Sequence, residues 1–340
     1  MRGNLMKLDI EQSIYGTVGD PLRYPSRRPN EAYLLDGTFA HKLTWSWNLN
    51  EVSFMETGES VSEFLRGRGE ASIEERIPQI AFGANRDLTN LAWKFANYKP
   101  TSGRTLSRCV LVLPGVVHDA AVVACNIGYW GYIYSSLIFH KENVVDRPFL
   151  EGANAPVSVL LLDDDQMVAM HESEGVLRPG DVSRPDVSCD VAMWDVESFG
   201  RSLTAQMYVL PLPYLSFDEQ RPVTFDSVKT GINGLENLNQ IEMWTRIIAS
   251  ATQINFREHE KDPYQLVEML RDVARKHMRY GQGSVDRAQQ LYEALRQYII
   301  TELALHNPDG TVDVATRNMP TLGNTEAWIT SHRLSDLADI

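Results

Sequence analysis

Cysteine is scarce in this chain: three residues, Cys109, Cys125 and Cys189, occur among 340. Three scattered cysteines exclude a dense disulfide framework, and no CxxC pair is present that would bind a metal ion. The N-terminal residues also lack the apolar core of a signal peptide. We therefore expect a cytoplasmic protein.

Positively charged residues are also outnumbered by negatively charged ones. The chain carries 32 Lys and Arg residues against 45 Asp and Glu residues, a formal net charge of −13. Nucleic acids and anionic membrane surfaces both select clustered Lys and Arg side chains. We therefore expect neither nucleic acid nor membrane as a partner.

No long apolar segment runs uninterrupted. The most apolar region, residues 109–139, contains Pro114, Asp119 and Asn126, and its β-branched content indicates successive strands instead of a membrane-spanning helix.

The remaining pattern predicts an α+β fold. A polar, turn-rich extension over residues 1–75 precedes a strand-rich region over 76–235, and residues 236–340 have helical spacing. We expect the extension to pack on the core and the last part to contain a C-terminal helical hairpin, with one helix from Pro263 and another from Ser284. The expected strands cover residues 77–82, 108–113, 119–126, 131–139, 157–162, 191–196 and 205–210.

Two short segments have the residue types of a site. In Phe82-Gly83-Ala84-Asn85-Arg86, the glycine has no Cβ and would let a ligand approach the main chain, whose N–H groups can face an oxyanion. Taken alone, the same residues also fit a tight turn without a ligand. Further along, Glu174 precedes Gly175-Val176 at the end of an expected helix, where a negative charge opposes the helix dipole.

Other candidates have structural interpretations. Asp163-Asp-Asp165 fits a helix cap better than a metal site, and we expect neither metal nor cofactor. Cys125 with His118 would suit a cysteine hydrolase, but no local motif supports that reading and buried cysteine is usually inert packing. His171-Glu172 lacks the second histidine of a zinc protease. Arg86 fits either a substrate contact or a surface ion pair.

These segments resemble the γ-glutamylcyclotransferase family, which has a Tyr-Gly-Ser-Asn-Leu turn after its first strand and a Glu-Gly-Val segment after a later short helix. The hydroxyl-rich strand that follows Gly131 and the strand that carries Tyr208 are similar to the family's too. The resemblance covers about residues 76–235 and implies a mixed β-barrel or sheet core with short helices. The family's Tyr, Ser and Leu are replaced by Phe82, Ala84 and Arg86, so Gly83 and Asn85 alone are retained.

The resemblance implies an enzyme that cleaves a γ-glutamyl amide. Glu174 would be general base and then acid, with a pKa raised by burial, and Tyr208 would order the substrate in a pocket formed by residues 82–86. The products would be 5-oxoproline and a free amine, in a reaction that needs no cofactor. Arg178 and Arg184 are candidates to receive a substrate carboxylate.

Two alternatives remain open. The same fold could hydrolyse an amide or transfer an acyl group without forming a lactam. A non-catalytic binding module would instead use the C-terminal helices as its interaction surface. The sequence identifies neither the leaving amine nor the oligomeric state, although the added segments favour a role in specialised metabolism.

Overall fold

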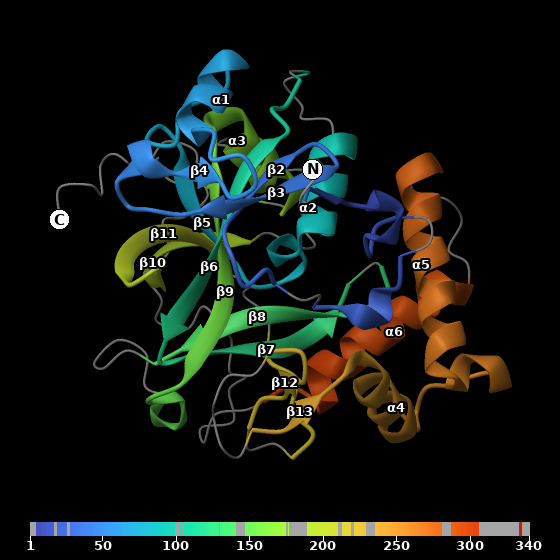
Figure 1. Cartoon of the computed structure of the whole chain (residues 1–340). Coiled ribbons are helices and arrows are strands. Elements are labelled where there is room, and N and C mark those ends of the chain that lie inside the picture. The colour runs from blue at the N-terminus through green and yellow to red at the C-terminus, as the bar shows by residue number, and fades with distance from the viewer. Residues whose placement is uncertain are drawn as a thin grey trace.

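The computed structural model describes residues 5–16, 19–25, 28–98, 103, 105–128, 130–140, 147–174, 176, 189–209, 213–218, 221–228, 235–280, 287–305 and 333–334, with the main chain alone for residues 190 and 273–280. These residues form an α+β fold, as the sequence predicts (Figure 1).

Five strands close into a barrel at the centre of the fold. Hydrogen-bonded neighbours follow the order β6, β10, β11, β5 and β9, and a further pairing of β9 with β6 completes the ring. The β5–β11 pair is parallel and the other four pairs are antiparallel, so the barrel is mixed. Closure removes free strand edges within the ring. The barrel strands are β5 (Ile77–Ala81), β6 (Cys109–His118), β9 (Asn154–Leu162), β10 (Asp190–Ser198) and β11 (Arg201–Val209).

The N-terminal residues continue the same sheet. Strand β2 (Tyr33–Asp36) pairs with β6, and β3 (Phe39–Thr44) pairs in turn with β2, with β1 (Met6–Lys7) and with β4 (Ser53–Phe54). Helix α1 (Val61–Gly67) follows. These strands lie in a polar segment whose glycines and prolines indicated turns.

A second sheet of four strands lies beside the barrel, and the C-terminal helices pack near it. In Figure 1 the three helices lie together on one side, and α6 crosses α5 instead of running alongside it. The Trp244 indole of α4 donates a hydrogen bond to the carbonyl oxygen of Gly131, 3.1 Å away. The elements are β7 (Ala120–Ile127), β8 (Ile133–Phe139), β12 (Thr224–Phe225), β13 (Asn237–Leu238), α4 (Gln240–Ser250), α5 (Pro263–Tyr280) and α6 (Arg287–Glu302).

Successive side chains of the barrel strands point to opposite faces of the sheet, so the apolar core is divided into two clusters. One cluster joins Leu160 and Leu162 of β9 to α2 (Leu88–Asn97) and α3 (Asp164–Ser173). The other extends to the second sheet and the C-terminal helices. Because α2 and α3 share one cluster, the C-terminal end of α3 is held near α2.

Contacts cross both predicted domain boundaries. Arg271 of α5 donates a hydrogen bond to the carbonyl oxygen of Gly16, and the Leu334 N–H donates to the carbonyl oxygen of Arg76 at 2.8 Å. The division into three parts therefore stays a prediction. In the part of the chain that the structure describes, no helix combines the length and the apolar character needed to span a membrane.

Candidate active site

The turn at residues 82–86 has the predicted strand, turn and helix order. Strand β5 ends at Ala81, a single 3-10 turn covers Ala84–Arg86, and α2 begins at Leu88. Asp87 caps α2, since its Oδ1 accepts hydrogen bonds from the N–H groups of Thr89 (2.9 Å) and Asn90 (3.0 Å). Capping fixes the direction in which the turn leaves the barrel.

Gly83 lies against two hydroxyl groups of the protein. A Cβ on this residue would lie 2.7 Å from the Tyr24 hydroxyl and 3.2 Å from Ser135 Oγ, and those two oxygens share a hydrogen bond of 2.6 Å. Burial raises the pKa of Tyr24 to about 12, so the phenol stays protonated. Tyr24 and Ser135 therefore occupy the side of Gly83 on which a Cβ would lie, and no larger residue fits there.

The neighbours of Gly83 differ in exposure. Phe82 is buried in the larger core cluster, whereas Ala84 is half-buried beside it. Arg86 is 1% exposed, so its interpretation as a surface ion pair is wrong. Burial lowers the pKa of the Arg86 guanidinium to about 10, which still leaves it charged at neutral pH.

The structure brings Glu174 directly to the turn. Glu174 is the C-terminal cap of α3, where its N–H donates to the carbonyl oxygen of Met170. Its Oε1 accepts a hydrogen bond from Asn85 Nδ2 at 2.8 Å and an ion-pair hydrogen bond from Lys94 Nζ at 2.6 Å. Two segments 89 positions apart in the sequence therefore meet at one carboxylate oxygen.

Opposing effects set the pKa of Glu174. Burial by itself would raise it, but the Lys94 ammonium and the hydrogen bonds from Lys94 and Asn85 together outweigh burial and lower it below its ordinary value. The expectation of a raised pKa is therefore wrong for the protein without a ligand. Glu174 is an ionised carboxylate at neutral pH.

Lys94 is the site residue that sequence reasoning missed. Its side chain is 9% exposed, and its ammonium also donates to Ser173 Oγ at 3.0 Å. The available signal was its position: Lys94 follows the buried Leu91 by three residues and buried Asn90 by four, which places all three on one face of α2. What that face would meet could not be read from α2 alone.

Tyr208 lies near Glu174 but already has a partner. Its hydroxyl is 2.9 Å from Nδ1 of His171, and the residue is buried. Burial and the nearby Glu174 carboxylate raise the pKa of Tyr208 well above its ordinary value. Any contact with a substrate would have to share this hydroxyl with His171.

Two half-exposed tryptophan rings pack around Tyr15, a residue close enough to Glu174 for its pKa to respond to that charge. The centroid of the Tyr15 ring lies 5.2 Å from that of Trp93 and 5.5 Å from that of Trp130. Burial and the charge of Glu174 raise the pKa of Tyr15 above its ordinary value. Tyr15 therefore connects this group of rings to the surroundings of Glu174.

No protein-family model, curated protein or solved structure matches this chain. A function for the chain can therefore be inferred only from its own residues and their geometry.

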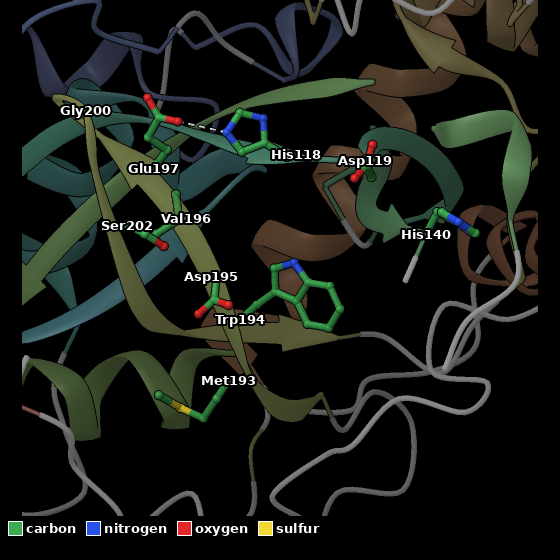
Figure 2. Close-up of a pocket in the computed structure, with 10 residues that line it drawn as sticks. All are labelled: His118, Asp119, His140, Met193, Trp194, Asp195, Val196, Glu197, Gly200 and Ser202. Atoms are coloured by element: carbon green, nitrogen blue, oxygen red, sulfur yellow. Dashed lines mark hydrogen bonds and ion pairs between the residues drawn. The ribbon is translucent and has the colours of Figure 1, made fainter. Parts of the chain in front are cut away.

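A cavity of about 440 Å³ lies elsewhere, and none of the predicted site residues lines it. Figure 2 shows its lining residues, which include His118, Trp194 and Glu197. Hydrogen bonds to Glu197 Oε2 (3.0 Å) and Asn154 Oδ1 (2.7 Å) raise the pKa of His118. The two ring nitrogens of His118 are therefore both engaged by Glu197 and Asn154.

The remaining candidates have structural roles or lie outside the described residues. Cys125 is fully buried, and burial raises the pKa of its thiol, so it does not form a dyad with the exposed His118. Asp163 caps α3 in a capping box with Gln166, as predicted. Within the described ranges, no group of three His, Cys, Asp or Glu side chains could hold a metal. Gly175, Arg178 and Arg184 lie outside these ranges.

Replacing Lys94 by Met should raise the pKa of Glu174, because burial would then be opposed by the hydrogen bond from Asn85 alone. In the unaltered chain, the lowered pKa of Glu174 contributes stability above the unfolded value of about 4.3, and this contribution is lost as the pH falls through the folded-state pKa. The destabilisation by K94M should therefore be largest at neutral pH and shrink in acid. Urea denaturation across a pH series measures it, and a difference that does not vary with pH would contradict the ion pair.

Proposed function

We propose that this chain is an enzyme of the γ-glutamylcyclotransferase type, which releases an amine and 5-oxoproline from a γ-glutamyl amide. The observation that carries the proposal is the 2.8 Å hydrogen bond between Asn85 and Glu174. It joins the two segments on which the sequence resemblance depends. A closed mixed barrel, with the turn at the end of β5, is compatible with the family's mixed β core.

In the proposed reaction the substrate supplies its own nucleophile. Glu174 takes a proton from the α-ammonium, and the free amine attacks the γ-carbonyl carbon to form the new C–N bond of a five-membered ring. Main-chain N–H groups of Gly83 and Ala84 stabilise the oxyanion. The Glu174 carboxylic acid gives its proton to the leaving nitrogen, and collapse breaks the original amide bond. The regenerated carboxylate then takes the second proton from the ring nitrogen, which leaves the neutral lactam of 5-oxoproline and the free amine.

Asn85 and Lys94 prepare Glu174 for the first of these steps. Both donate to Oε1, which holds the carboxylate in one orientation and keeps it ionised. An ionised carboxylate is the form that accepts a proton. Its lowered pKa also means that the bound substrate must raise it before the transfer becomes efficient.

A panel of γ-glutamyl amides tests the proposal. Incubation with the protein should release 5-oxoproline together with the free amine, and mass spectrometry identifies both products. The panel should include anilides and indole amines, because the charge of Glu174 acts on Tyr15, whose ring packs with two tryptophans. Absence of amine release from every member would overturn the proposal.

Hydrolysis or acyl transfer at the same site is the second candidate. The hydroxyls of the family's Tyr and Ser are missing at Phe82 and Ala84, so a γ-glutamyl chain has fewer contacts that would fold it toward a lactam. The product decides between the candidates, since glutamate is heavier than 5-oxoproline by one water. Release of glutamate, or its transfer to an added amine, would favour this second reaction.

A further inference from the structure

We propose that Lys94 and Glu174 together bind the charged head group of an α-amino acid, with the Lys94 ammonium holding its α-carboxylate and the Glu174 carboxylate its α-ammonium. This inference rests on the proposed function, because a γ-glutamyl group carries both charges on one carbon atom. It assigns Lys94 as the residue that selects substrates with a free α-carboxylate.

Among the described residues, the Lys94 ammonium makes two hydrogen bonds and can donate a third. Of its three N–H groups, one is directed to Glu174 Oε1 and another to Ser173 Oγ, at 2.6 and 3.0 Å. These contacts fix a side chain that is 9% exposed, so little rotamer entropy is lost when a ligand binds. The third N–H is available for a carboxylate oxygen.

Two acceptors beside Lys94 are also without a donor. Among the described residues, Oε2 of Glu174 makes no hydrogen bond, because Asn85 and Lys94 both use Oε1. Asn85 Oδ1 is buried and has no hydrogen-bond partner there either. A buried acceptor without a partner is costly, and a ligand ammonium would satisfy it together with Glu174 Oε2.

Charge complementarity favours a zwitterion over a single ion. A ligand carboxylate alone would be attracted by Lys94 but repelled by Glu174, and an ammonium alone would meet the reverse. An α-amino acid head group offers both charges, and its approach produces four alternating charges without adding net charge to the site. Hydrogen bonds between charged groups are the stronger kind, so this arrangement discriminates well.

Carboxylate binding at Lys94 also helps the proposed reaction. The Lys94 ammonium is the main reason that the pKa of Glu174 is lowered in spite of burial. A substrate carboxylate shares that ammonium and weakens its effect on Glu174. The pKa of Glu174 then moves upward in the complex, which is the direction that efficient proton transfer requires.

Two matched substrates test the role of Lys94. One is the 4-nitroanilide of γ-glutamate with a free α-carboxylate, and the other has an α-carboxamide in its place. The unaltered protein should prefer the carboxylate by about 10- to 100-fold in kcat/KM, mostly through KM. Lys94→Met should bring this ratio close to one, and Lys94→Arg should restore part of it because the positive charge returns.

The ratio of kcat/KM for the two substrates separates binding of the α-carboxylate by Lys94 from the effect of Lys94 on the basicity of Glu174. Both substrates share the attacking amine and the scissile amide, so the direct effect of a substitution on the basicity of Glu174 in the free protein alters the two rates together, whereas a binding preference appears in KM. Comparing the ratio between variants also cancels the effect of the carboxamide on the pKa of the amine. Lys261→Met is the matched control, because Lys261 forms an exposed ion pair with Glu258 at 3.0 Å and lies outside the site. A ratio that K94M leaves unchanged would overturn the inference.

Failure of the proposed function would be recognised separately. If no γ-glutamyl amide is cleaved, the head-group site is measured by calorimetry with L-glutamine and with its α-amide. Binding of L-glutamine that is tighter than binding of the amide, with the preference lost in K94M, would support the site without the reaction. Equal binding of the two ligands, or binding of neither, would overturn it.

Discussion

Glu174→Gln should lower the release of amine from a confirmed γ-glutamyl substrate by at least about 10²-fold, within the range typical of general acid–base catalysis. Glutamine has nearly the same shape and can still accept a hydrogen bond from Lys94, but it cannot take up the substrate's proton. We therefore expect the loss mainly in kcat. Chromatographic measurement of 5-oxoproline at several substrate concentrations gives kcat and KM.

A matched substitution separates chemistry from folding. Glu236 forms an ion pair with Arg246 at 2.6 Å on the surface, with 42% of its side chain exposed. Glu236→Gln makes the same chemical change away from the site and should leave turnover unaltered. Far-UV circular dichroism should show the same fold for both variants. Turnover by E174Q equal to that of the unaltered protein would refute the assignment of Glu174.

The same variant also tests the non-catalytic alternative. If the chain is a binding module that uses its C-terminal helices, E174Q should fold and retain its biological activity. If the chain is an enzyme, that activity should fall together with turnover.

Gly131→Ala should lower the free energy of unfolding by about 2–4 kcal/mol, since it combines backbone strain with overpacking. Gly131 has φ of +78°, a conformation that alanine rarely adopts. Its added Cβ would lie 2.8 Å from the carbonyl oxygen of Val267 and 3.3 Å from Cβ of Leu270, both on α5. Main chain cannot move aside as a flexible side chain does. Urea denaturation followed by circular dichroism measures the change.

Gly152→Ala isolates the backbone component of this effect. Gly152 has φ of +76°, and a Cβ there would meet no atom within 4 Å. We expect it to cost about 1–2 kcal/mol, from strain alone. Equal destabilisation by the two substitutions would show that contact between Gly131 and α5 contributes nothing. A larger effect at Gly131 would show that the C-terminal helices stabilise the whole fold.

Local patterns in the sequence identified most regular elements. β-branched runs gave the barrel strands, and the Asp262-Pro263 pair gave the start of α5. The turn after β5 and the capping of α3 by Asp163 were also correct, because both depend on residues close together in sequence. The short strands β2 and β3 were missed, since they lie in a polar segment whose glycines and prolines indicated turns.

The sequence could not supply the surroundings of each functional group. Helical spacing placed Lys94 on a face of α2, but the carboxylate opposite it comes from residue 174, 80 positions later. The same limit explains the error over Arg86, whose burial depends on the packing around it and not on its neighbours in the chain.

By itself, then, the sequence determined the order of the barrel strands, the tight turn at Gly83 and the position of Glu174 at the end of α3. Tertiary structure alone decided that β9 closes the barrel on β6, that Tyr24 fills the space beside Gly83, and that Lys94 lowers the pKa of Glu174. The physical reason is the distance along the chain over which each interaction acts. Propensity and capping act within a few residues, whereas a pKa is set by whichever charges folding brings within a few ångströms.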